Sequence, residues 1–216
     1  MDSPWLIGFL ILSSYLLGSI PFGVVVSRLL GAVDPRSAGS KNVGFTNVLR
    51  VSGKKAGILT LLGDIGKGWL AGWVGTMLLH QESAILWVAL ASVIGHLHSA
   101  FLGFKGGKGV ATALGAVLGV APWIGLTLMG LWVGAVFLWK YSSGGALFAF
   151  AMFPIVALLF HRSWTFIGFA CVVSLLIWVR HKDNLVRLLS EDAKSLHVES
   201  RKILIIQECM KTLPRQ

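Results

Sequence analysis

Cysteine and acidic residues are scarce in this chain of 216 residues, which has 2 Cys and 9 Asp plus Glu against 19 Lys plus Arg. Cys171 falls in an apolar run and Cys209 in the polar tail, so neither a disulfide framework nor a metal cluster is indicated. Charged residues make up 13% of the chain and hydrophobic residues 55%, which excludes an ordinary soluble domain. The composition predicts an all-α, polytopic helical integral membrane protein.

The surplus of positive charge, formally +10, does not indicate nucleic acid as a partner. The cations are scattered among apolar runs and are not gathered on one soluble face. We expect anionic membrane lipid and phosphorylated metabolites as partners. Residues 1–4 carry no Lys or Arg, and the apolar stretch that follows reaches Leu30, so we expect a retained first span and not a signal peptide.

Six apolar runs divide the chain, at about 5–30, 56–79, 84–104, 110–139, 145–160 and 164–179. The fourth would make a helix of about 45 Å, longer than a hydrocarbon core of about 30 Å, and Pro122 lies near its middle. If it breaks at Pro122 and the N-terminus is outside, seventeen of the nineteen Lys and Arg residues face one compartment. A single crossing would instead move nine of them outside, against the positive-inside tendency.

We therefore predict about seven membrane segments, some short or broken, with a cytoplasmic C-terminus. Residues 1–189 form the membrane-embedded domain and residues 190–216 a polar cytoplasmic tail. This topology collects the polar, glycine-bearing loops on the cytoplasmic side, at 34–55, 105–109, 140–145 and 180–189. The function is expected on that face.

The stretch GFKGGKGVAT (103–112) resembles a phosphate-binding loop without matching the Walker A pattern, because Leu102 and Gly109 occupy its first Gly and its Ser/Thr positions. Its glycines permit close approach of backbone N–H groups to an anion, and Lys108 adds charge. A bound phosphate would sit at the N-terminus of the helix that starts at Val110. The alternative is a flexible loop whose lysines anchor to lipid headgroups.

The loop at 34–55 favours an anion site over a solvated linker. Gly39 and Gly44 permit tight turns, and Arg50 can bind phosphate oxygens through two N–H groups. Short hydrogen-bonding side chains are concentrated here: Ser40, Asn42, Thr46 and Asn47.

Charged and titratable residues in and near the spans could have either a structural or a functional role. Asp64 and Lys67 share one helical face, which predicts a structural ion pair supporting the first loop, with direct substrate contact as the alternative. His96 is expected to be a packed or interfacial residue. The H-x-x-x-x-D acyltransferase pattern is excluded, because Phe101 and Gly103 occupy the Asp position after His96 and His98. His181 with Asn184 makes a better candidate polar pair than His96 does. Ser142 and Ser143 could either cap the start of a helix or bind a ligand.

The motifs GSIPFG (18–23), GSKNVGFTNVLR (39–50), FKGGKGVAT (104–112) and RHKDNLVRLL (180–189) resemble those of the bacterial acyl-phosphate:glycerol-3-phosphate acyltransferase (PlsY) family, from about residue 10 to residue 189. The resemblance implies a seven-helix inner-membrane enzyme that moves a fatty acyl group from acyl phosphate to the sn-1 hydroxyl of glycerol 3-phosphate, forming lysophosphatidic acid. It implies no metal, no other cofactor, no acyl-CoA and no acyl carrier protein, and a phosphate group as the proton acceptor.

The resemblance and the chemistry of the residues together lead to expected roles. Lys108, His181 and Asn184 are expected to be catalytic. Substrate binding is expected of Ser40, Asn42, Thr46, Asn47, Arg50, Gly106, Gly107, Gly109 and Ser143. Asp64, Lys67 and His96 are expected to be supporting residues.

The sequence departs from the family pattern at several positions. Lys41 stands where the family usually has Gly, Phe45 where it usually has Ala, and Ala146 where a second Ser often lies. The usual G-x-E after Leu189 is absent. These departures leave open a divergent homologue with an altered substrate. The cationic loops leave open a second alternative, a transporter of a phosphorylated solute.

Overall fold

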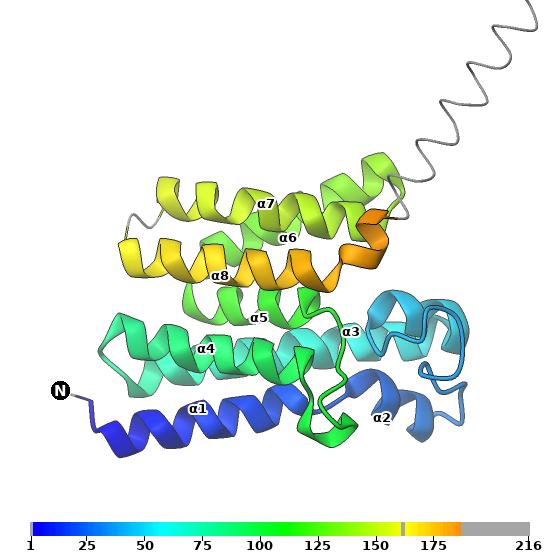
Figure 1. The fold of residues 1–216 in the computed structure, drawn as a ribbon, viewed down its shortest axis with the longest axis horizontal. Helices are drawn as coiled ribbons and strands as arrows, with labels where there is room; N and C mark the ends of the chain where they lie inside the picture. Colours follow the sequence, from blue (N-terminus) through cyan, green and yellow to red (C-terminus); the bar gives the residue numbers. More distant parts are fainter. Residues whose placement is uncertain (1, 161–162, 187–216) are drawn as a thin grey trace, which may run out of the picture. The chain divides into compact units, whose positions relative to one another are not determined.

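The structure, a computed structural model, describes residues 2–160 and 163–186 (Figure 1). The chain divides into two units, Met1–Arg180 and His181–Gln216. Within the described residues all regular structure is helical, which confirms the predicted fold class. The predicted boundary at residue 189 and the tail 190–216 lie outside the described residues.

The first unit is a bundle of α-helices with one short 3-10 turn (Figure 1). In chain order its elements are α1 (Pro4–Ser19), α2 (Phe22–Leu29), α3 (Phe45–Leu78), α4 (Glu82–Leu97), η1 (Ala100–Leu102), α5 (Val110–Val120), α6 (Pro122–Trp139), α7 (Ser142–Phe160) and α8 (Trp164–Arg180).

Each of the seven predicted membrane segments is helical, with α1 and α2 together accounting for the first. By length and apolar composition, three stretches of the described chain could cross a membrane: Glu82–Leu102, Pro122–Trp139 and Ser142–Phe160. The pair α1 and α2, bent by 46°, would make a fourth. Of the others, α3 carries Asp64 and Lys67 in its apolar part, while α5 and α8 are shorter.

Proline accounts for two breaks in the bundle. The predicted break at Pro122 is present, because α5 ends at Val120 and α6 begins at Pro122, where a missing N–H costs the helix nothing. At 11 residues α5 is about 16 Å long, about half a hydrocarbon core. The predicted first span is a bent pair, since the chain leaves helical geometry between α1 and α2, at Ile20 and Pro21.

The prediction of a loop over 34–55 was right only in its first part. Helix α3 begins at Phe45, so the polar residues from Thr46 onward lie on a helix and not on a flexible loop. Within α3, Gly53 has φ +88° and ψ 173°, a conformation open in practice only to glycine, and it kinks the helix there. The segment Phe45–Ser52 is therefore set off from the membrane part of α3.

Close helix packing places α5 in the interior. A Cβ atom on Gly68 of α3 would lie 2.1 Å from the Thr112 carbonyl oxygen of α5, and one on Gly115 would lie 2.0 Å from that of Ile65. Such contacts let two backbones meet, as small residues do between membrane helices. The main apolar core joins Leu114 of α5 with residues of α4, α7 and α8, among them Leu97, Phe150, Phe153 and Phe166.

The two ends of the bundle differ in chemistry. We call the loop end the one where α2, α4, α6 and α8 finish and α3, α5 and α7 begin (Figure 1). Among residues 2–160 and 163–180, every Lys and Arg belongs to the loop end or the segments that adjoin it, except Lys67. At the opposite end the Asp2 carboxylate accepts the N–H groups of His80 and Gln81, and Ser163 donates to Glu82.

Candidate active site

The loops of the first unit converge at the loop end. Thr46 Oγ1, at the start of α3, lies 3.1 Å from Ser142 Oγ, at the start of α7. Val43, from the segment before α3, and Gly106, from the segment before α5, line one narrow pocket. The structure therefore brings the segments that precede α3, α5 and α7 together.

Asn47 organises the first loop. Its side chain is buried, and its Nδ2 donates to the carbonyl oxygens of Pro35 (2.9 Å), Ala38 (3.2 Å) and Asn42 (2.9 Å). Its Oδ1 accepts the N–H of Ser40 at 2.9 Å. The amide is thus fully engaged inside the loop, so its geometry fits loop stabilisation better than the predicted substrate contact.

Other polar side chains of the site remain available. Arg50, on an exposed face of α3, and the exposed Ser40 make no side-chain hydrogen bond or ion pair within the residues that the structure describes. Ser143 likewise has no such side-chain partner there and is half-buried at the start of α7. Asn42 Oδ1 accepts the N–H of Gly44 at 3.3 Å, a local turn contact.

Lys41 adopts the left-handed conformation that its position demands. Its φ is +58°, a region that glycine enters freely and that costs an L residue about 1–2 kcal/mol. This conformation gives a physical reason for the glycine that the resemblance expects there. The turn is also shaped by Asp34, whose carboxylate accepts hydrogen bonds from the backbone N–H, Nε and Nη2 of Arg36, and the guanidinium lowers the pKa of Asp34 to about 2.

The glycines at 106 and 107 do not present their N–H groups to an anion as predicted. The Gly106 N–H donates to the Leu97 carbonyl oxygen (3.1 Å) and the Gly107 N–H to that of His96 (3.0 Å). A Cβ atom on Gly107 would lie 2.2 Å from His96 Nε2. These glycines let the loop pack flat against the end of α4.

The N-terminus of α5 is the part of this loop that suits an anion. Gly109 precedes the helix with φ +84°, and the first helical hydrogen bond runs from the Ala113 N–H to the Gly109 carbonyl. The N–H groups of Val110, Ala111 and Thr112 therefore have no acceptor within the helix, and the helix dipole favours negative charge there. The half-buried Lys108 directly precedes this turn.

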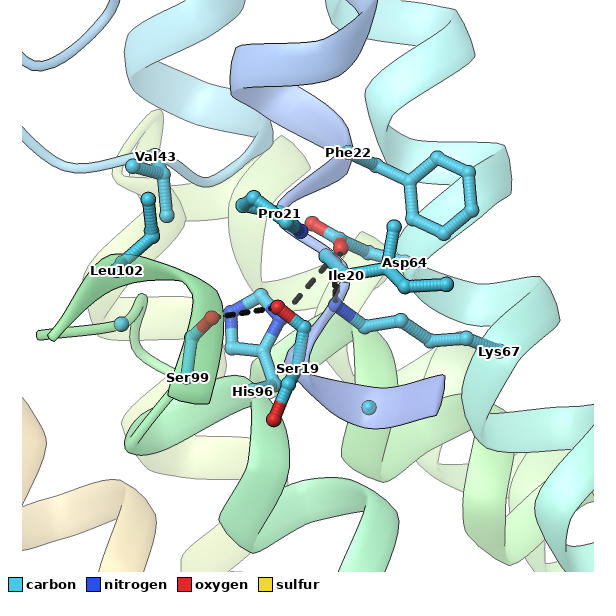
Figure 2. Close-up of a pocket in the computed structure, with 12 residues that line it drawn as sticks. Ser19, Ile20, Pro21, Phe22, Val43, Asp64, Lys67, His96, Ser99 and Leu102 are labelled. Carbon is cyan, nitrogen blue, oxygen red and sulfur yellow. Dashed lines mark hydrogen bonds and ion pairs between the residues drawn. The ribbon is translucent and has the colours of Figure 1, made fainter. Parts of the chain in front are cut away.

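A buried charged cluster lies next to the loop that contains Gly106 (Figure 2). The predicted ion pair is present, with Lys67 Nζ 2.9 Å from Asp64 Oδ1, and both residues are at most 3% exposed. Lys67 Nζ also donates to the Ile20 carbonyl oxygen at 2.7 Å, which the break between α1 and α2 leaves without a helical partner. The pair therefore supports this break, and support of the loop before α3 stays a prediction.

His96 connects that cluster to the glycine loop. Its Nδ1 lies 3.4 Å from Asp64 Oδ1 and 3.1 Å from Thr112 Oγ1, and its side chain is buried as predicted. Its other ring nitrogen faces Gly107. Among the described residues no three His, Cys, Asp or Glu side chains are grouped where they could hold a metal ion.

Arg180 was missed in the sequence. This last residue of α8 donates from Nη2 to the carbonyl oxygens of Gly106 and Gly107, both at 3.0 Å, and from Nε to that of Gly107 at 3.2 Å. The one available signal was its position at the head of the motif RHKDNLVRLL, but nothing in the sequence indicates a contact across more than seventy positions.

His181 and Asn184 belong to the second unit, of which the structure describes residues 181–186. There the N–H groups of Asn184 and Leu185 both donate to the His181 carbonyl oxygen at 2.9 Å, in a short helical turn. The i, i+3 spacing is therefore helical. Their role in the site stays a prediction.

The helices and the convergent loops define a polytopic helical membrane protein with a cationic, glycine-bearing site at one end. The family model described as glycerol-3-phosphate acyltransferase matches residues 8–191. The chain belongs to the glycerol-3-phosphate acyltransferase family.

Relatives named glycerol-3-phosphate acyltransferase include one from Bordetella petrii, 49% identical over 84% of this chain and 89% of that protein. One from Bordetella pertussis is 47% identical over 83% and 87%. A crystal structure of PlsY, an integral membrane glycerol 3-phosphate acyltransferase, in its glycerol 3-phosphate form has 40% identity, covers 86% of this chain and 92% of its own, and superposes with a TM-score of 0.81. Its lysophosphatidic acid form gives a TM-score of 0.79 at the same identity and coverage.

Proposed function

We propose that this protein transfers a fatty acyl group from acyl phosphate to the sn-1 hydroxyl of glycerol 3-phosphate and so forms lysophosphatidic acid. The observation that carries the proposal is the close match, over most of both chains, to a PlsY structure with forms named for glycerol 3-phosphate and for lysophosphatidic acid. The cationic loop end of this chain offers the matching chemistry for two phosphorylated substrates.

We assign the protein to the bacterial cytoplasmic membrane, with the loop end and the C-terminus in the cytoplasm. The segregation of Lys and Arg to the loop end supports this orientation through the positive-inside rule. Trp5, Trp123 and Trp164, all more than three-quarters exposed, lie in the first turns of α1, α6 and α8 at the opposite end, as interfacial tryptophans do. Both substrates would then approach from the side where soluble metabolites are made.

The reaction needs positioning and charge stabilisation more than a protein nucleophile, because acyl phosphate is already an activated mixed anhydride. The sn-1 hydroxyl oxygen bonds to the acyl carbon, and the bond from that carbon to the phosphate oxygen breaks. The hydroxyl proton passes to a phosphate oxygen. No metal or other cofactor enters this scheme.

The geometry refines the roles of the predicted residues. The first turn of α5 with Gly109 and Thr46 holds the phosphate of the acyl donor, and the acyl chain lies among the helices. Lys108 stabilises negative charge on the carbonyl oxygen and the leaving group. Ser40, Arg50 and Ser143, whose side chains have no partner within the described residues, receive glycerol 3-phosphate.

Four of the remaining predicted residues shape the loops, and the roles of the other two stay predictions. Asn47 and Asn42 shape the first loop, and Gly106 and Gly107 let the second loop pack on α4. From the resemblance, His181 and Asn184 are expected to orient the hydroxyl groups of glycerol 3-phosphate.

Proteoliposomes separate this proposal from a transporter of phosphorylated solutes. Labelled glycerol 3-phosphate is supplied outside, with palmitoyl phosphate in the bilayer. We expect label in the lipid fraction as lysophosphatidic acid and no faster entry of label into the lumen than in empty vesicles. Accumulation of unmodified label in the lumen without lipid product would establish a carrier instead.

Single substitutions test the assigned roles. Removing one preorganised stabiliser of developing charge lowers kcat by about 10²–10³-fold, so Lys108→Ala should fall in that range. Arg50→Ala should nearly abolish transfer at low glycerol 3-phosphate. The control is Lys105→Ala, because Lys105 is exposed and belongs to the same loop. Rates near wild type for Lys108→Ala or Arg50→Ala would remove that residue from the site.

A further inference from the structure

The peptide unit that joins Gly106 to Gly107 is fixed at both of its polar ends. Its N–H donates to the His96 carbonyl oxygen at the end of α4, at 3.0 Å. Its carbonyl oxygen accepts Nη2 of Arg180, also at 3.0 Å. Two helices that are remote in sequence thus hold the same peptide plane.

The next carbonyl along the chain is held even more firmly. The Gly107 oxygen accepts both Nε (3.2 Å) and Nη2 (3.0 Å) of the same guanidinium. This oxygen belongs to the peptide bond that leads into Lys108. The backbone on the N-terminal side of Lys108 therefore depends directly on where the Arg180 guanidinium lies.

The opposite face of the loop leaves no room for an alternative position. Cβ atoms on Gly106 and Gly107 would fall 1.9 Å from the His96 oxygen and 2.2 Å from His96 Nε2. The His96 ring is in turn set by Asp64 and Thr112. The loop is therefore clamped between a buried histidine on one side and a planar cation on the other.

Arginine suits this place through geometry more than through charge. Its planar guanidinium presents several N–H groups in fixed directions, whereas the lysine ammonium is a compact charge on a flexible stem. The three hydrogen bonds to two successive carbonyl oxygens use that fixed fork. A lysine would keep the charge at the loop end and lose this arrangement.

We propose that Arg180 is a positioning residue for the reaction, which sets the place of Lys108 by holding the backbone of Gly106 and Gly107. The proposal rests on the proposed function of Lys108. A displacement of about 1 Å in a reacting group can cost on the order of 10²-fold in rate. Arg180→Lys is accordingly expected to lower kcat by about 10- to 100-fold.

The test is a double-mutant cycle in purified protein with palmitoyl phosphate and glycerol 3-phosphate, using Arg180→Lys, Lys108→Ala and the double variant. If Arg180 acts through Lys108, the double variant is as slow as Lys108→Ala alone, because the two changes remove one effect. The matched control is Arg28→Lys, the same change at an exposed position at the end of α2, which should keep kcat within about twofold.

Hydrogen exchange of the peptide covering residues 103–112 gives a readout that does not depend on activity. Arg180→Lys should speed exchange of the Gly106 and Gly107 amides while the thermal midpoint stays within a few degrees, and Arg28→Lys should leave exchange unchanged. Multiplicative loss of rate in the double variant, or unaltered exchange in Arg180→Lys, would overturn the positioning role. An inactive wild-type protein whose Arg180→Lys variant shows faster exchange would refute the proposed function and leave the clamp intact.

Discussion

Lys41→Gly should stabilise the protein, although glycine substitutions usually do the opposite. Lys41 has φ +58°, and the left-handed region costs an L residue about 1–2 kcal/mol. Glycine removes that strain but adds about 0.5–1 kcal/mol of backbone entropy to the unfolded chain. The expected net gain is therefore up to about 1.5 kcal/mol with a midpoint of about 0.75 kcal/mol, and the midpoint corresponds to a rise in Tm of about 2–3 °C for a chain of this size.

The assay is thermal unfolding in detergent, followed by the fluorescence of the 9 tryptophans. Lys41→Ala is the key control, because it removes the same charge and leaves the strain, so its Tm should not rise. Lys55→Gly is the opposite control: this exposed lysine lies within α3, where glycine costs about 1 kcal/mol. An equal gain for Lys41→Ala would show that charge repulsion is relieved, and a loss for Lys41→Gly would refute the strain argument.

Three further substitutions test the packing and the buried polar groups by the same unfolding assay. Gly68→Ala should destabilise the protein strongly, because its Cβ would lie 2.1 Å from the Thr112 carbonyl oxygen. Gly66→Ala on the same helix has open space around it and should not destabilise the protein. Equal effects would contradict the close crossing of α3 and α5. Asp64→Asn should cost about 3–5 kcal/mol because it strands the buried Lys67 ammonium, and adding Lys67→Met should recover part of that loss; no recovery would argue against an ion pair. Asn47→Ala should lower the free energy of unfolding by about 1–3 kcal/mol, since four hydrogen bonds are lost, and should expose residues 35–42 to limited proteolysis. An unaltered cleavage pattern would show that other contacts hold the loop.

Local sequence signals predicted the helical segments and one of their breaks. Pro122 inside an overlong apolar run predicted the break between α5 and α6, and the i, i+3 spacing of Asp64 and Lys67 predicted their ion pair. These succeed because proline geometry and helix periodicity act within a few residues. Pro21 carried the same signal for α1 and α2 and was overlooked because the run reads as uniformly apolar.

The contacts within the site could not be predicted, because they depend on which distant helix ends meet. The glycines of KGGKG suggested N–H groups aimed at an anion, but those of Gly106 and Gly107 are taken by carbonyls at the end of α4. Asn47 was predicted to bind substrate, and the structure shows its amide engaged within its own loop, a set of contacts that the sequence did not indicate. The polar composition of a loop indicates that hydrogen bonds form and does not identify their partners.

The choice of donor tests the central claim most directly. Purified protein is incubated with labelled glycerol 3-phosphate and either palmitoyl phosphate or palmitoyl-CoA, and lipid products are separated. The account predicts labelled lysophosphatidic acid from palmitoyl phosphate and none from palmitoyl-CoA. Product from palmitoyl-CoA alone, or no product from either donor in folded protein, would contradict it.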